Sequence, residues 1–270
     1  MKKHLKEIQF SIFQLIIGGK KPELANFAAI DEANFEKQTI GEDLLNIKKI
    51  EKEYIPERFI ALCFEEGNKF PYSEKVIDSK LKESLNPRSI DKVELNEQFY
   101  VLVDLLTSRI YISDLRKKGF LINWLEDKIK KEIAVKPLIA QREFIDKIES
   151  IKEICFTVEP DLLNSASIGL PARLREDIFG FGATEAIIKL VYKNKKKIGK
   201  QLYEKVKDII KNKTEYKNIT VIGRTSEDFE SIFNTQEVIS KITLLAPMNR
   251  KNGKFINKEL VSELIKKIHE

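Results

Sequence analysis

Residues 98–114 read Q-F-Y-V-L-V-D-L-L-T-S-R-I-Y-I-S-D, and this stretch decides the fold class. The run 99–103 is continuously apolar, Thr107 and Ser108 are turn residues, and 109–112 is again rich in apolar side chains. This pattern predicts an antiparallel β-hairpin. Because two strands alone are at best marginally stable in water, the hairpin needs further strands or a covering helix.

The sequence on both sides of the hairpin predicts such partners. Alternating or continuous apolar residues predict strands at 6–17, 58–64, 151–158, 186–192, 218–224 and 238–245. Apolar residues at helical spacing predict helices at 42–50, 73–85, 119–132, 141–151, 196–211 and 257–268. We therefore expect an α+β fold of two domains, each a mostly antiparallel sheet with helices packed on one face. The expected domains are an N-terminal one at 1–133 and a C-terminal one at 150–270.

Composition and cysteine usage indicate a globular protein of the cytoplasm. The 270 residues are 42% hydrophobic and 9% aromatic, which is enough to bury a core. Cys63 and Cys155 each lie in an apolar run, as expected of free thiols in a reducing compartment. No apolar run reaches the roughly 18 residues of a membrane helix, and the first residues lack the pattern of a secretory signal.

The sequence shows no catalytic constellation. Its two histidines, His4 and His269, lie close to the chain ends, which disfavours a Ser–His or Cys–His pair. It contains neither a G-x-x-x-x-G-K-[ST] loop nor a G-x-G-x-x-G turn after a predicted strand. We therefore expect a protein that is not an enzyme and that has no cofactor and no metal site.

Positive charge is concentrated in one segment. Residues 189–217 contain eleven lysines and three acidic residues, a net charge of +8, whereas the whole chain carries +6. The densest part lies where a predicted strand meets a predicted helix. Lysine is slightly unfavourable at a helix N-terminus, where the helix dipole is positive, but backbone amides there bind phosphate. An anionic partner such as duplex DNA, with about one charge per 1.7 Å, accounts for this accumulation.

The candidate DNA-binding residues belong to this segment or follow it: Lys193, Lys195, Lys196, Lys197, Lys200, Lys207, Arg224, Arg250 and Lys251. Because lysine is a point charge, the set favours binding without base preference. The arginines either hold phosphates or serve as ordinary ion-pair partners. A solvated basic face, or a face that contacts an anionic membrane, accounts for the same charge and stays an alternative.

The same region resembles a known family. Residues 186–210 read A-I-I-K-L-V-Y-K-N-K-K-K-I-G-K-Q-L-Y-E-K-V-K-D-I-I, and L-A-P-M-N follows at 245–249. A strand that runs into a lysine-rich helix, and an A-P-hydrophobic-N turn before the last helix, resemble the RexA-like family of phage exclusion proteins. The resemblance covers about residues 178–265, a third of the chain. The DNA-binding subunit of the Kiwa anti-phage system is a related possibility.

The resemblance implies a cytoplasmic homodimer of two-domain α+β subunits that binds duplex DNA without strong sequence preference. It also implies that the protein senses phage infection, through DNA or DNA–protein complexes, together with a membrane-protein partner. The positions that match DNA contacts are Lys193, Lys195, Lys196, Lys197 and Lys200. The N-terminal half shows no match, so the resemblance assigns it no role.

Two alternatives belong to other functional classes. One is a metal-dependent nuclease of a defence system that uses acidic residues of the hairpin, such as Asp104 and Asp114. The other is a protein-interaction subunit whose lysines form only a solvated face. Nicking of plasmid DNA with Mg²⁺ or Mn²⁺ would indicate the first, and binding to anionic vesicles without DNA retention would indicate the second.

Overall fold

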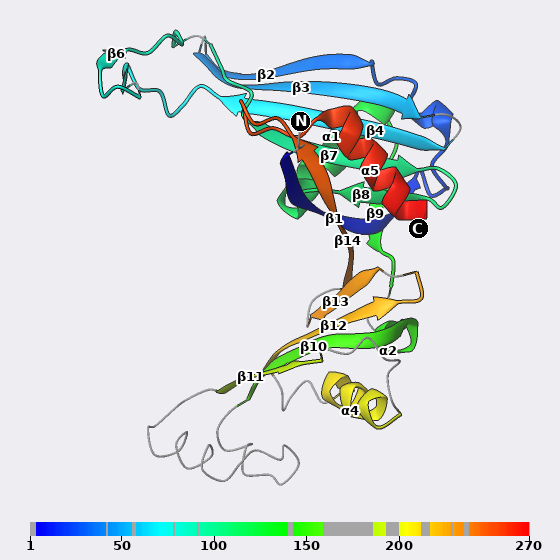
Figure 1. Ribbon diagram of the computed structural model, residues 1–270. Coiled ribbons are helices and arrows are strands. Elements are labelled where there is room, and N and C mark those ends of the chain that lie inside the picture. Colours follow the sequence, from blue (N-terminus) through cyan, green and yellow to red (C-terminus); the bar gives the residue numbers. More distant parts are fainter. Residues whose placement is uncertain are drawn as a thin grey trace. The chain divides into compact units, whose positions relative to one another are not determined.

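A computed structural model describes residues 4–41, 43–55, 58–77, 79–90, 92–139, 143–158, 186–192, 200–211, 217–227, 229–234 and 238–269. Antiparallel strands dominate these residues, with a few helices, which confirms the coarse expectation of a mostly antiparallel α+β chain (Figure 1). The chain forms two compact units. Unit 1 comprises Met1–Lys136 with Thr243–Glu270, and unit 2 comprises Pro137–Ile242.

The two units differ from the expected domains because the end of the chain, from Thr243, belongs to unit 1. The chain leaves unit 1 after Lys136, within the expected 133–150 boundary, but it returns at Thr243. Strand β14 (Val238–Met248) therefore contributes residues to both units. Within unit 1, β14 lies beside β1 (His4–Ile17), and Gln9 Nε2 donates a hydrogen bond to Thr243 Oγ1 at 3.3 Å. This long-range pairing places the last helix in unit 1.

Unit 1 is built around the predicted hairpin. Strands β7 (Glu97–Asp104) and β8 (Arg109–Ile112) pair antiparallel, with Val101 opposite Ile112. The strand order continues on both sides as β14-β1-β8-β7-β4-β3-β2, and β9 (Ile133–Pro137) also pairs with β1. The remaining strands are β2 (Ala33–Ile40), β3 (Asp43–Ile55) and β4 (Phe59–Asn68).

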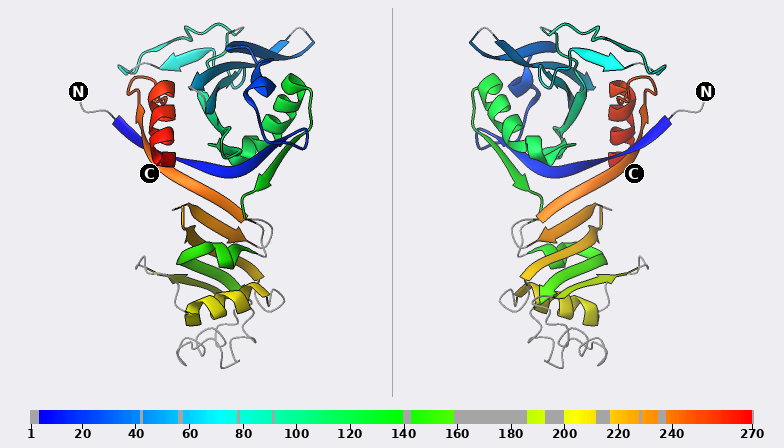
Figure 2. Two further views of the ribbon diagram at one scale, coloured as in Figure 1. Left: turned by 90° about the vertical axis from the view of Figure 1, so that its right-hand side faces the viewer. Right: turned by 90° about the vertical axis from the view of Figure 1, so that its left-hand side faces the viewer.

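Helices cover both faces of this sheet, not one face as expected (Figure 2). Phe64 of β4 contacts Trp124 of α1 (Lys118–Ile129), with ring centroids 5.2 Å apart. Phe59, on the opposite face of the same strand, contacts His269 of α5 (Asn257–His269) at 5.8 Å. Side chains alternate between faces along a strand, and both faces of β4 are buried. Its continuous apolar run is typical of a strand covered on both sides.

Two predicted helices of unit 1 are strands, so these predictions were wrong. Residues 43–50 belong to β3, which pairs with β2 on one side and β4 on the other. Residues 73–85 contain β5 (Lys75–Ile77) and β6 (Glu83–Leu85), which form a separate two-stranded sheet. Ser73, at the start of the expected helix, donates its hydroxyl hydrogen to the carbonyl oxygen of Lys75.

Unit 2 is a smaller antiparallel sheet in the order β11-β10-β12-β13-β14. Its strands are β10 (Ile148–Val158), β11 (Ala186–Val191), β12 (Lys217–Thr225), β13 (Glu230–Asn234) and residues 238–242 of β14. Helices α2 (Phe144–Lys147) and α4 (Lys200–Lys211) contribute to its core. Within the described part of the expected helix 141–151, which begins at residue 143, the α-helix ends at Lys147 because β10 begins at Ile148 and pairs there with Thr225.

The core of unit 2 lies on the helix-bearing face of the sheet. Two of its fully buried residues come from the helices, Phe144 from α2 and Val206 from α4. Two more come from the strands, Val221 from β12 and Phe233 from β13. Because side chains alternate, Ile222 and Arg224 lie on the other face of β12. Across all the described residues, no helix is long and apolar enough to cross a membrane.

Candidate nucleic-acid interface

The densest part of the basic segment lies outside the described residues. This applies to Lys193, Lys195, Lys196 and Lys197. Lys200 is the first residue of α4, which the structure describes through Lys211. The structure therefore shows the two elements that flank the lysine-rich connection, namely β11 before it and α4 after it.

Helix α4 is anchored by apolar residues and by one tyrosine. Val206 is fully buried in the core of unit 2. The Tyr203 hydroxyl donates a hydrogen bond to the Asp146 carboxylate of α2, and this contact raises the pKa of Tyr203. The Lys207 ammonium lies 5.4 Å from the centroid of the Tyr203 ring, within cation–π range. These contacts fix the helix against unit 2.

Three lysine positions align along α4. Positions 200, 207 and 211 are seven and four residues apart, which helix geometry brings to one side. The first turn of α4 contains no acidic residue, although a negative charge there would be stabilising. Glu204, four residues after Lys200 and three before Lys207, lies on the same side, and Asp208 lies three residues before Lys211; both acidic side chains are exposed. This basic side of the helix therefore carries three lysine positions and one acidic residue, Glu204, and it begins at the N-terminal end of α4.

Arg224 does not join this basic side. It lies on the face of β12 opposite the core that holds Val206, and its neighbour on β13 is Glu230. The same face carries Lys189, whose ammonium forms an ion pair with Glu153 of β10 at 2.9 Å. The hydrogen bond with Glu153 raises the pKa of Lys189. Acidic neighbours along this face favour ion pairing over phosphate binding as the role of Arg224.

Arg250 and Lys251 belong to unit 1, not to unit 2. Both are exposed in the turn between β14 and α5. The turn is closed by a hydrogen bond from the Gly253 amide to the Asn249 carbonyl oxygen at 2.9 Å, and the Lys251 amide donates to Asn249 Oδ1 at 2.9 Å. The candidate residues thus divide between the two units.

The carboxylates of the nuclease alternative are already engaged. Asp104 is fully buried and accepts hydrogen bonds from Arg58 Nε at 2.9 Å and Arg58 Nη2 at 2.7 Å. It also accepts from the Leu106 amide at 3.0 Å and the Thr107 hydroxyl at 2.8 Å. Burial acts to raise the pKa of Asp104, but the hydrogen bonds from Arg58 and Thr107 outweigh it, so the pKa is lowered.

Asp114 has a comparable local role. It precedes the 3₁₀ turn η2 (Leu115–Lys117) and accepts hydrogen bonds from the amide and guanidinium of Arg116, at 2.8–3.0 Å. The hydrogen bond from the Arg116 side chain lowers the pKa of Asp114. Among the described residues, no group of three or more His, Cys, Asp and Glu side chains is arranged to hold a metal ion.

The fold creates a second basic feature that sequence reasoning missed. Gly18 and Gly19, with φ of 56° and 76°, form a tight turn, and the Gly18 amide donates to the Glu132 carbonyl oxygen at 2.8 Å. This contact brings Lys20, Lys21 and Lys131 to a cavity of about 440 Å³. In the sequence this basic feature is indicated only by the doublets Lys20-Lys21 and Lys130-Lys131, which lie more than a hundred residues apart.

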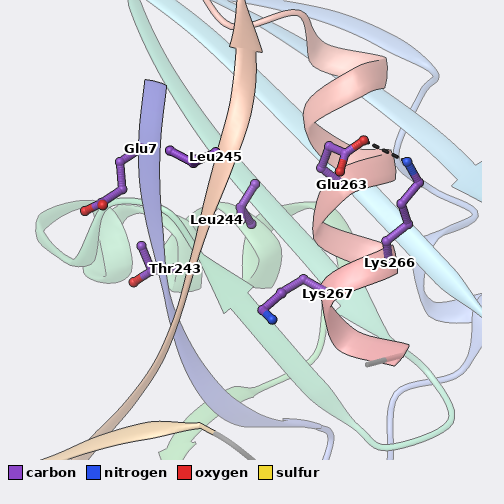
Figure 3. Close-up of a pocket in the computed structure, with 7 residues that line it drawn as sticks. All are labelled: Glu7, Thr243, Leu244, Leu245, Glu263, Lys266 and Lys267. Atoms are coloured by element: carbon purple, nitrogen blue, oxygen red, sulfur yellow. Dashed lines mark hydrogen bonds and ion pairs between the residues drawn. The ribbon is translucent and has the colours of Figure 1, made fainter. Parts of the chain in front are cut away.

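Another cavity, of about 410 Å³, lies in unit 1 and has mixed charge. Figure 3 shows that its lining residues come from β1, β14 and α5. Glu263 and Lys266 form an ion pair at 2.8 Å, and Lys267 and Glu7 add charges of opposite sign. The balance of charges does not favour a polyanion, so we do not include this cavity in the candidate interface.

Comparison with known proteins assigns no family to the chain: no family model and no curated protein matches it. The functional argument therefore depends on the arrangement of charge and on the physical chemistry of the elements described above.

Proposed function

We propose that the protein binds duplex DNA without sequence preference through the lysine-rich connection between β11 and α4. The observation that carries this proposal is the concentration of charge. Eleven lysines and three acidic residues occupy 189–217, which includes the whole of α4. A net charge of +8 in so short a segment would attract polyanions and release their counterions on binding.

The flanking elements support electrostatic binding rather than base recognition. Helix α4 is anchored through Val206 and Tyr203, so lysine positions 200, 207 and 211 are held on one side of a fixed element, together with Glu204. Lysine contacts phosphate as a point charge, whereas base recognition in the major groove relies mainly on Arg, Asn and Gln. Arg224 lies on the other face of the sheet, among acidic neighbours. The interface we propose therefore consists of Lys193, Lys195, Lys196, Lys197, Lys200 and Lys207.

We further propose that this binding serves phage exclusion, in a cytoplasmic protein that acts without a catalytic step of its own. The resemblance to the RexA-like family supports this role, as do the engaged states of Asp104 and Asp114. On this proposal the two units act as two α+β domains of a homodimer. A membrane-protein partner and a phage component, such as a DNA–protein complex, complete the pathway.

Fluorescence anisotropy with a labelled 30-base-pair duplex, measured over a salt series, tests the proposal. The test variant replaces Lys193, Lys195, Lys196, Lys197 and Lys200 by Glu. We expect the wild type to bind with a steep salt dependence and the variant to lose binding. Each lysine that contacts a phosphate contributes about 0.9 to the slope of log K against log salt concentration.

A matched variant controls for total charge. It replaces five exposed lysines outside the segment by Glu: Lys37, Lys92, Lys136, Lys147 and Lys258. Both variants carry the same net charge, so we expect the control to keep most of its affinity. Equal loss in the two variants, or no binding by the wild type at low salt, would overturn the proposed site. Magnesium-dependent nicking of plasmid DNA would support the nuclease alternative instead.

A further inference from the structure

Strand β11 forms the outer edge of the unit 2 sheet. Among the described residues it pairs only with β10, in an unbroken register from Val191 opposite Glu153 to Ala186 opposite Val158. The Tyr192 amide donates to the Lys152 carbonyl oxygen at 2.9 Å. Backbone groups alternate along an antiparallel strand. The N–H and C=O groups of Ile187, Lys189 and Val191 therefore point away from β10, toward the edge.

The side chains at this edge are apolar and exposed. Ile187 is 74% exposed and Val191 is 56% exposed, on the face of the sheet opposite the core. Ile188, in contrast, packs against that core. Proteins commonly protect free edges with charged side chains, because an unprotected edge is a template for another strand. The only charged side chain of β11 is Lys189, and Glu153 neutralises it at 2.9 Å.

The edge strand of unit 1 shows the usual protection. Strand β2 reads A-N-F-E-K-Q-T-I and pairs only with β3 among the described strands. Lys37 is exposed in its middle, next to Glu36, which forms an ion pair with Lys128 at 3.1 Å; among its side chains that the structure describes, Phe35 is the one large apolar side chain that is exposed. The two edges of the same chain therefore differ in kind. Strand β11 has the composition of a strand that is covered in the assembled protein.

We propose that β11 pairs antiparallel with β11 of a second copy of this chain, about a two-fold axis at Lys189. In this register Lys189 lies opposite Lys189 of the second copy, and Ile187 lies opposite Val191 of the second copy. All three outward-facing residues then exchange both of their backbone hydrogen bonds with the other strand. A shift of two residues in either direction leaves one of these three residues without a counterpart in the strand of the second copy.

The pairing is self-complementary, as a two-fold interface requires. Ile187 and Val191 are β-branched residues on the same face, and each meets the other across the axis, which is a favourable cross-strand pair. Like charges directly opposite are unfavourable, but each Lys189 keeps its own Glu153. These features favour a second copy of the chain over an unrelated strand as the occupant of the edge.

The pairing also affects the DNA-binding segment. Because the strands run antiparallel, the two lysine-rich connections would leave the paired strands at opposite ends. With a rise of about 3.4 Å per residue, the two Tyr192 positions would lie roughly 20 Å apart along the strand direction. This inference specifies the surface of the homodimer within the proposed function. Its test contains no DNA, so its failure and a failure of DNA binding are distinguishable.

Sedimentation equilibrium of the full chain at micromolar concentration tests the pairing through one backbone group. Lys189→Pro removes an N–H that faces the open edge, so pairing with β10 is retained. Lys189→Ala also removes the ion pair with Glu153 but keeps the N–H. We expect the wild type and Lys189→Ala to have the mass of two chains, and Lys189→Pro to have the mass of one. A one-chain wild type, or a two-chain Lys189→Pro, would overturn the proposal.

A disulfide tests the register. Cα atoms of a hydrogen-bonded antiparallel pair lie about 5.5 Å apart, within the range of a disulfide. Lys189→Cys is made with Cys155→Ala, because Cys155 lies opposite Lys189 on β10. We expect this protein to form a disulfide-linked dimer under oxidising conditions. Ile187→Cys in the same background should stay unlinked, because its counterpart lies four residues away along the strand. Linkage through Ile187→Cys with none through Lys189→Cys would contradict the register.

Discussion

Arg58 and Asp104, which are 46 residues apart, form a two-point ion pair that joins the residue before β4 to the last residue of β7. The Asp104 carboxylate is fully buried, and it also accepts hydrogen bonds from the turn that leads to β8. The pair therefore joins two neighbouring strands and the hairpin turn. These contacts explain an acidic residue at this position without any catalytic role.

Replacement of Asp104 by Asn should destabilise unit 1. The variant keeps the volume of the side chain but leaves the Arg58 guanidinium without a charged partner. Breaking a buried pair by removing one partner is costly, and with Arg58 partly exposed we expect a loss of about 2–3 kcal/mol. Urea unfolding followed by circular dichroism measures it. Asp114→Asn, where the partner Arg116 is largely exposed, should cost far less. Equal losses would contradict the structural role assigned to Asp104.

The same pair should contribute to acid sensitivity. The pKa of Asp104 in the folded protein is below its ordinary value of 3.8. Its stabilising contribution is therefore complete above the unfolded-state pKa and is lost as the pH falls through the folded-state pKa. The difference in unfolding free energy between wild type and Asp104→Asn should be constant from about pH 7 to pH 5 and shrink below about pH 4. A difference that grows on acidification would contradict this sign.

Replacement of Gly67 and of Gly119 by alanine should change the stability of the protein in opposite directions. A Cβ at Gly67, in β4, would collide with the Glu94 backbone carbonyl, whereas a Cβ at Gly119, in α1, would meet nothing within 4 Å. We expect Gly67→Ala to destabilise the protein by about 1–3 kcal/mol. Gly119→Ala should stabilise it by about 0.5 kcal/mol, because alanine favours the helix. Thermal unfolding of the two variants gives both signs in one experiment.

Cys63 should be unreactive in the folded protein. Burial, reinforced by the nearby Glu51, raises the pKa of its thiol to about 12. At pH 8 the thiolate, which is the reactive form, should then be about a thousandfold less populated than for an ordinary cysteine. Titration of Cys155→Ala with a thiol reagent should show slow labelling in buffer and rapid labelling in urea. Fast labelling of the native variant would show that β4 opens readily.

The fold could be predicted where the apolar pattern of the sequence matches the burial of the residues in the structure. The runs 99–103, 110–112 and 59–64 are continuously apolar because they lie at the centre of a covered sheet. Residues 42–50 predict a helix because Leu44, Ile47 and Ile50 recur at intervals of three residues, whereas the structure places residues 43–50 in β3. The strand pattern of β3 is also interrupted just beyond these residues. Lys52 occupies an inward position of that strand, where its ammonium donates to the carbonyl oxygens of Phe27 and Ile30. A buried lysine is invisible to hydrophobic periodicity.

The candidate site was predictable only where its residues are contiguous. The lysines around α4 belong to one segment, so counting charges finds them. The grouping of Arg224, Arg250 and Lys251 with them depended on distances that a sequence does not contain. Arg224 lies on the other face of the sheet, and Arg250 belongs to the other unit. The same limit applies to Lys20 and Lys131, which only the fold brings to one cavity.

Lys207 offers the most direct measure of phosphate contact by α4. If its ammonium contacts DNA, Lys207→Gln should weaken binding uniformly across sequences and lower the salt slope by about one. The substitution removes the charge and the contact of Lys207 with the Tyr203 ring. The helix should stay in place, because Val206 still anchors α4 in the core. Lys241→Gln, a partly exposed lysine of β14, is the control. Anisotropy with two duplexes of unrelated sequence should show the loss for Lys207→Gln alone. An unchanged slope would show that Lys207 lies outside the contact surface.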